Sequence, residues 1–235
     1  MSLFKRVEGV FFNPKAVFED LAQKPAWVDA LLLVLILVIA FSALVGPYLQ
    51  QDNIKIWKDA EVRMTERMGE EAYAKRLENM ENPTPGSQVI QLLGAAVMTA
   101  VFILFQSLVL LILGRFVSTS GTYKQVFSAL VHASLVDKLL GGAVRAVLAL
   151  TKKSVMQTST GLALFFPKLE VTSTPYIILT SVDFFQLWLF GILGYGLSAI
   201  FKIDLKKALF LSYFFWFLKT LANIGIGLVG MSFMR

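Results

Sequence analysis

The sequence contains no cysteine and a single histidine, His132, among its 235 residues. The absence of cysteine excludes disulfides, thiolate metal sites and a cysteine nucleophile. One imidazole is too few for a histidine-based metal centre. The chain also lacks the residue order of a Ser–His–Asp triad, a nucleophile elbow or an HExxH zinc motif. We therefore predict that the protein is not an enzyme and has no catalytic residues, no metal site and no cofactor.

Charged residues are also scarce. They make up 16% of the chain, whereas hydrophobic residues make up 56%, and the mean hydropathy is +0.67. Soluble domains of this length rarely reach that balance, so the composition predicts a polytopic membrane protein in contact with the lipid bilayer. The net charge of +6 requires no nucleic-acid partner, because membrane proteins retain Lys and Arg in their cytoplasmic turns.

Long apolar stretches dominate the rest of the sequence. They predict an all-α bundle of five transmembrane helices, because about 20 apolar residues are needed to cross a bilayer. The predicted spans are 26–45, 90–113, 126–150, 176–201 and 208–231. Gly46-Pro47 is expected to end the first span. The fourth span is the central element, and its Gly191, Gly194 and Gly196 allow close contact with neighbouring helices.

Residues 1–25 precede the first span and predict two short amphipathic helices. Asn13 can cap a helix and Pro14 suits its first position, so this pair marks the start of the second helix. Two interpretations stay open: the helices lie in the membrane interface with their apolar faces inserted, or they pack against the transmembrane bundle. The segment does not resemble a cleaved signal peptide, so the first span is expected to remain in the mature protein.

Residues 48–86 form the one sizeable polar segment, between the first and second spans. Its apolar side chains follow a helical spacing, which predicts an extramembrane helical insertion. Two interpretations are open here as well. The segment is a solvated hairpin of helices resting on the bundle, or it is a docking surface in which methionine and aromatic side chains contact a partner. The candidate partner contacts are Trp57, Met64, Met68 and Tyr73.

Basic residues gather in the short turns 115–124 and 202–207 and in the N-terminal segment. With five spans, these three regions lie on the same side of the membrane. The positive-inside rule therefore predicts a multi-pass protein of the cell membrane with a cytoplasmic N-terminus and an external C-terminus.

Four charged residues lie deep inside predicted spans: Asp137, Lys138, Asp183 and Lys219. Each costs about 2.5–3.5 kcal/mol at the centre of an isolated helix, so we expect them to form an intramembrane polar cluster. The candidate pairs are Asp183 with Lys219, and Asp137 with Lys138 or Lys219. The cluster is either an ion or proton path or a set of salt bridges that fixes helix register. Arg145 and His132 also lie in the third span, and His132 is either a proton shuttle or a packing residue.

Three stretches of the sequence contain characteristic residues in a characteristic order. They are Asn13-Pro14, Phe18, Leu21 and Pro25; Gly121-Thr-Tyr-Lys-Gln-Val-Phe; and Asp183-Phe-Phe-Gln-Leu-Trp188 with Gly196-Leu-Ser and Lys206-Lys207. In order and spacing, these stretches resemble the Yip1 domain family of small polytopic membrane proteins, in its bacterial form. The likeness covers the chain apart from residues 48–86, which look like an insertion. Many relatives have a proline near the middle of the third span, where this chain has Val136-Asp137-Lys138.

The resemblance implies a five-helix membrane domain, here residues 26–235, that acts through partners. Eukaryotic relatives bind small GTPases of membrane traffic, and some bacterial relatives accompany export-type ABC transporters. We therefore predict a non-catalytic adaptor or scaffold of the bacterial inner membrane, with ABC transporter subunits as candidate partners. The alternative is a small transporter or channel that uses the charges of the intramembrane cluster. Self-association into a homo-oligomer is left open.

Overall fold

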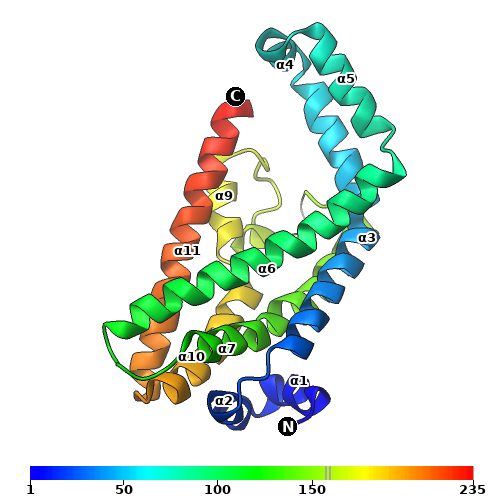
Figure 1. The fold of residues 1–235 in the computed structure, drawn as a ribbon. Helices are drawn as coiled ribbons and strands as arrows, with labels where there is room; N and C mark the ends of the chain where they lie inside the picture. Colours follow the sequence, from blue (N-terminus) through cyan, green and yellow to red (C-terminus); the bar gives the residue numbers. More distant parts are fainter. Residues whose placement is uncertain (157, 159, 235) are drawn as a thin grey trace.

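The computed structural model describes residues 1–156, 158 and 160–234 (Figure 1). Its α-helices are α1 (Leu3–Phe12), α2 (Pro14–Gln23), α3 (Val28–Asp59), α4 (Glu61–Met68), α5 (Glu70–Glu81), α6 (Pro85–Arg115), α7 (Tyr123–Leu135), α8 (Gly142–Lys152), α9 (Thr174–Ser181), α10 (Phe184–Phe201) and α11 (Leu205–Met234). A π-helix, η1 (Val136–Gly141), joins α7 to α8, and a short 3₁₀ helix, η2 (Leu162–Phe165), precedes α9. These described residues contain no β-strand, so the predicted all-α class is confirmed.

Three long helices, α3, α6 and α11, frame the molecule (Figure 1). The N-terminus lies at the lower end with α1 and α2, whereas α4 and α5 lie at the upper end, as does the C-terminus. Large, fully buried side chains gather on α2, α7 and α10: Phe18, Leu21, Leu130, Leu135, Phe190, Leu193 and Phe201. The hydrophobic core therefore lies toward the N-terminal end of the bundle.

Residues 1–25 form two helices that meet at Asn13. Its side chain accepts a hydrogen bond from the amide three residues further on, and Pro14 takes the first helical position. α2 packs on α7 and α10 and buries three apolar side chains, Val17, Phe18 and Leu21. α1 instead exposes Phe4 and Phe12, which are 78% and 84% accessible. α1 also packs on α7 through its buried Val10 and Arg6, so both helices contact the bundle. Insertion of the exposed face of α1 into a membrane interface stays a prediction.

α3 is longer than predicted, because it passes through Gly46-Pro47 and runs to Asp59. A proline in a helix interior costs about 3 kcal/mol relative to alanine, so tertiary contacts are needed to hold the turns beyond it. Gln50 Nε2 donates to a carbonyl of α5 at 2.7 Å, and the Asp52 carboxylate accepts a hydrogen bond from Val155 N at 2.7 Å. The predicted end of the first helix at residue 45 is therefore wrong.

Four helices are long and apolar enough to cross a membrane: α3, α6, α10 and α11. The predicted count of five is wrong by one. The third predicted span, 126–150, is not among these four helices, although α7, η1 and α8 follow one another through it without a break. All side chains from Val126 to Asp137 are buried. A helix buried on every face lies inside a bundle, so this segment is a central element and does not face lipid.

The fourth predicted span is a broken helix. α9 ends at Ser181, and α10 begins at Phe184 with Asp183 as its N-cap. Asp183 Oδ1 accepts hydrogen bonds from the amides of Phe185 at 2.8 Å and Gln186 at 3.1 Å. Aspartate favours this position because its side chain satisfies amides that have no partner within the helix. Asp183 therefore lies at the start of a helix and not, as predicted, in the interior of one.

The last part of α3, from residue 48, forms an arm with α4 and α5 at the upper end of the molecule (Figure 1). The rings of Trp57 and Tyr73 stack with their centroids 6.2 Å apart, and Tyr73 Oη donates to the Trp57 carbonyl at 3.3 Å. Lys58 and Glu81 form an ion pair of 2.6 Å between α3 and α5. The arm is helical, as its apolar spacing indicates, and it has a small packed centre of its own. Its place outside the membrane stays a prediction.

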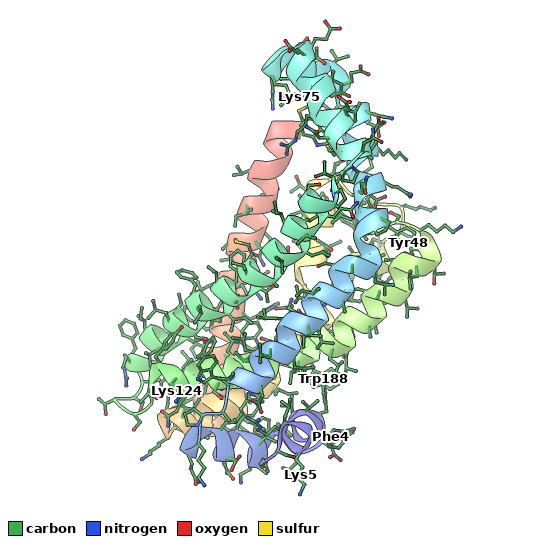
Figure 2. All side chains as sticks on the ribbon, turned by 45° about the vertical axis from the view of Figure 1, so that its right-hand side comes forward. Phe4, Lys5, Tyr48, Lys75, Lys124 and Trp188 are labelled. Atoms are coloured by element: carbon green, nitrogen blue, oxygen red, sulfur yellow. The ribbon has the colours of Figure 1, made fainter. Side chains whose placement is uncertain are left out.

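The two basic turns meet α2 at the lower end of the molecule. Ser118 Oγ donates to the carbonyl of the last residue of α10, and Gln125 Nε2 donates to a carbonyl of α2. Figure 2 shows Lys124 at this end, close to the N-terminal helices, and Lys75 at the opposite end. The N-terminal segment and the turns 115–124 and 202–207 therefore share one end of the bundle, which is the arrangement that the orientation prediction requires.

Candidate functional site

A polar cavity of about 490 Å³ lies among α3, α6, η1, α8, α9, α10 and α11. Its charged lining consists of Asp137, Lys138, Arg145, Asp183 and Lys219. The structure thus brings together all four residues of the predicted intramembrane cluster and adds Arg145. Apolar side chains form another part of the wall: Leu37, Val38, Phe41 and Trp216. A mixed lining of this kind is typical of ligand sites, which combine apolar walls with a few fixed polar groups.

Asp137 is the most buried charge of the cavity. Its Oδ2 lies 2.9 Å from Lys138 Nζ, and its Oδ1 lies 2.6 Å from Arg145 Nη2. Arg145 Nη2 also donates to the Asp137 backbone carbonyl at 3.0 Å. The pairing of Asp137 with Lys138, one of the two pairings predicted for this residue, is confirmed. Two cations on one buried carboxylate offset much of the cost of its burial.

The π-helix explains why Arg145 reaches Asp137. Residues eight positions apart in a regular α-helix lie about 80° apart around the axis. The wider π turn accommodates one extra residue, which reduces this offset to about 20°. Arg145 and Asp137 therefore face the same side of the α7–α8 segment, and regular helical periodicity does not reveal the pair.

Arg145 also connects the two acids of the cavity. Its Nη1 lies 3.4 Å from Asp183 Oδ2 and donates to Thr160 Oγ1 at 3.1 Å. Thr160 Oγ1 in turn donates to the same carboxylate oxygen of Asp183. The predicted pair of Asp183 with Lys219 is therefore wrong. As the N-cap of α10, Asp183 is held beside α8, and the guanidinium of Arg145 reaches it there.

Lys219 has a different environment. Its Nζ donates to Gln186 Oε1 at 2.6 Å and lies 5.4 Å from the centre of the Phe190 ring. Gln186 comes from the first turn of α10, which Asp183 caps. Among the described residues, Lys219 has no carboxylate within ion-pair distance, so its contacts are with a neutral oxygen and a ring face.

His132 lies in the centre of α7 and is fully buried. Its Nδ1 is 2.8 Å from the Ser128 carbonyl, one turn earlier in the same helix. The residues that line the cavity in the described part of the chain do not include His132. The geometry therefore favours the packing interpretation of this side chain over the proton shuttle.

The candidate partner contacts of the arm fall into two groups. Trp57 and Tyr73 pack on each other, and burial raises the pKa of Tyr73. Met64 is half-buried and Met68 is 42% exposed. The aromatic pair thus stabilises the arm, whereas the methionines remain accessible on α4.

The cavity is a charge network with a small positive excess. Its lining carries three cations and two carboxylates, a formal net charge of +1. Within the described residues, no three histidine or acidic side chains converge as metal ligands. Both carboxylates accept contacts from cations or other donors. The arrangement can fix helix register, and it can attract a negatively charged group to Lys219.

Comparison with known families matches the chain to the Yip1 domain over residues 9–226. The match includes residues 48–86, which were predicted to be an insertion, and all but the end of α11. Searches of curated proteins and of solved structures gave no match. The four apolar helices agree with a family of multi-pass membrane proteins. Since the match covers nearly the whole sequence, the chain belongs to the Yip1 domain family.

Proposed function

We propose that the protein is a non-catalytic adaptor of the bacterial inner membrane that binds another membrane protein through its arm. The observation that carries the proposal is the arm itself. Its helices extend past the bundle and are held by their own aromatic stack and ion pair. Such a preorganised surface binds without a large ordering cost. Family membership supports a role through partners, because the resemblance implies no catalytic site.

α4 supplies the contact surface of the arm in this proposal. Val62 is 72% exposed and lies on the same short helix as Met64 and Met68. Methionine suits a partner contact because its side chain is flexible and polarisable. Trp57 and Tyr73 act indirectly, since they hold α5 against the end of α3.

The partner is a membrane protein with a surface on the same side as the arm. With the N-terminus in the cytoplasm, the arm lies on the outer face of the inner membrane. Subunits of an export-type ABC transporter, which the family resemblance implies, are the candidates. The exposed Phe4 and Phe12 of α1 then face the cytoplasmic leaflet, where phenylalanine side chains can insert beside basic residues.

Replacing residues 61–81 with a short Gly/Ser linker tests the proposal. The linker joins the end of α3 directly to the segment before α6, so Gln50 loses its contact with α5 and Asp52 retains its contact with Val155. We expect a monodisperse, helical protein in mild detergent that no longer co-purifies its membrane partner. Met68→Glu should weaken the same interaction, whereas the exposed control Lys75→Gln should not. Equal recovery of the partner with the linker variant contradicts the proposal.

A small transporter or channel is the second candidate function, and the polar cavity among membrane helices favours it. Ion or proton flux into proteoliposomes that contain the purified protein tests this candidate. Flux that Asp183→Asn abolishes supports transport. Proteoliposomes with the parent protein that are no leakier than empty ones contradict it.

A further inference from the structure

We infer that the polar cavity binds the phosphate group of an anionic phospholipid and that Lys219 is its principal contact. The inference concerns a ligand site and is independent of the proposed arm contact. It rests on the distribution of charge in the cavity, on the donors along one face of α11, and on the apolar wall opposite them.

The charge distribution favours an anion. Asp137 contacts Lys138 and Arg145, and Asp183 contacts Arg145, a hydroxyl and two backbone amides. The carboxylates are thus well supplied with donors, which leaves little capacity for a bound cation. Lys219 has three N–H donors, of which the contact with Gln186 uses one. A singly charged phosphodiester would balance the lining's net charge of +1.

The donors lie on one face of α11. Trp216, Lys219, Thr220 and Asn223 all line the cavity. Their spacing of three, one and three positions is that of neighbours on a single helical face. An ammonium, a hydroxyl and an amide are therefore presented side by side. A phosphate group has several oxygens that accept such donors, and hydrogen bonds between charged groups are about twice as strong as neutral ones.

The apolar wall points to a lipid as the source of the phosphate. Leu37, Val38 and Phe41 of α3 and Trp216 of α11 line the same cavity, and α3 and α11 both belong to the membrane-crossing set. Next to Lys219, Leu218 and Leu221 are exposed on the surface of α11. A headgroup in the cavity would thus continue into acyl chains along apolar surface. Inorganic phosphate offers the same headgroup chemistry but makes no use of this wall.

Native mass spectrometry of the full-length protein tests the inference. The protein in mild detergent is mixed with equal amounts of phosphatidylglycerol and phosphatidylcholine of identical acyl chains, with and without inorganic phosphate. Both lipids carry the phosphodiester, but the choline of phosphatidylcholine brings a further positive charge to a cavity whose lining already has a net charge of +1. We therefore expect phosphatidylglycerol to be retained at least about tenfold better. Equal retention of the two lipids overturns the inference. Bound inorganic phosphate without retained lipid overturns the lipid assignment and identifies a free anion as the ligand.

Variants at Lys219 locate the site. Lys219→Gln and Lys219→Met should lose the preference for phosphatidylglycerol, whereas Lys219→Arg should keep it. Lys75→Gln removes the same charge from the arm and is the matched control. Asn223→Leu changes no charge and should weaken binding, which keeps the test valid if the neutral Lys219 variants do not fold. An unchanged preference in Asn223→Leu and in the neutral variants that fold overturns the assignment.

Discussion

Arg145 is the central residue of the ion-pair network. Contacts run from Lys138 to Asp137, from Asp137 to Arg145, and from Arg145 to Asp183. Each acid therefore depends on a cation that comes from the α7–α8 segment. Removing one member of a buried pair leaves an uncompensated charge, which is more costly than removing both. The stability lost on removing one charged side chain therefore depends on which other charges it contacts.

Arg145→Gln should destabilise the protein strongly. The change leaves Asp137 with Lys138 alone and deprives Asp183 of its cation, so we expect a loss of about 3–5 kcal/mol in the free energy of unfolding. Thermal unfolding in detergent, followed by circular dichroism, measures the effect. Lys75→Gln in the arm serves as the control for loss of one positive charge. A melting temperature equal to that of the parent would show that the network is not stabilising.

Double-mutant cycles should separate the two cations near Asp183. Asp183→Asn and Arg145→Gln remove groups in contact, so their losses should couple by about 0.5–3 kcal/mol. Asp183→Asn and Lys219→Met remove groups that the structure does not pair, so their losses should add. Unfolding of the parent, the three single variants and the two double variants under one condition provides the comparison. Coupling to Lys219 that exceeds coupling to Arg145 would contradict the observed pairing.

The sequence revealed four members of the cavity and missed the fifth for a physical reason. Asp137, Lys138, Asp183 and Lys219 stand out because charges are rare in apolar stretches. Arg145 lies nearer the end of its stretch, where a basic residue is ordinary. Its pairing with Asp137 depends on the π-helix, and no residue type in the sequence predicts where a π-helix forms. The partner of Asp183 was missed because depth along a helix does not specify which neighbour a side chain faces.

Local sequence predicts where helices form, whereas the positions at which helices are interrupted depend on tertiary contacts. Asn13-Pro14 marks the start of α2, because capping and the proline ring act within a few residues. Pro47 did not end α3, because contacts with α5 and with the segment after α8 hold the helix beyond it. The break before Asp183 and the π-helix both occur where ion pairs cross between elements.

Changing the length of the π-helix should test its role. Deleting Leu140, which is exposed, removes the extra residue, so Arg145 stays within about 20° of Asp137 in a regular helix. Inserting one alanine after Leu140 turns Arg145 away by about 100°. We expect the insertion to lower the melting temperature about as much as Arg145→Gln and the deletion to lower it far less. Equal decreases in melting temperature for the insertion and the deletion would show that the π-helix does not set the position of Arg145 relative to Asp137.

The bundle has two chemically different ends. The N-terminal segment and both basic turns lie at one end, and the arm, with Glu70 and Lys75, lies at the other. Because basic residues stay in the cytoplasm during insertion, this arrangement is the basis for the proposed orientation.

Cysteine labelling should report the orientation directly, since the natural chain contains no cysteine. Single cysteines at Lys124 and Lys206 should resist a membrane-impermeant thiol reagent in intact cells, because both positions are expected in the cytoplasm. A cysteine at Glu70 should react. All three should react after the membrane is permeabilised, which is the control for accessibility. Labelling at Lys206 in intact cells would reverse the orientation.

The burial of α7 from Val126 to Leu135 has a consequence for biogenesis. A nascent segment enters the bilayer on its own only when it is long and apolar enough, and α7, at 13 residues with polar side chains, is neither. Its surroundings, α2, α6 and α10, are synthesised partly before and partly after it. We expect α7 to wait at the insertion machinery until α10 emerges and then to enter the membrane with it as one unit. Chains truncated before α10 should therefore be recognised as unfinished and degraded.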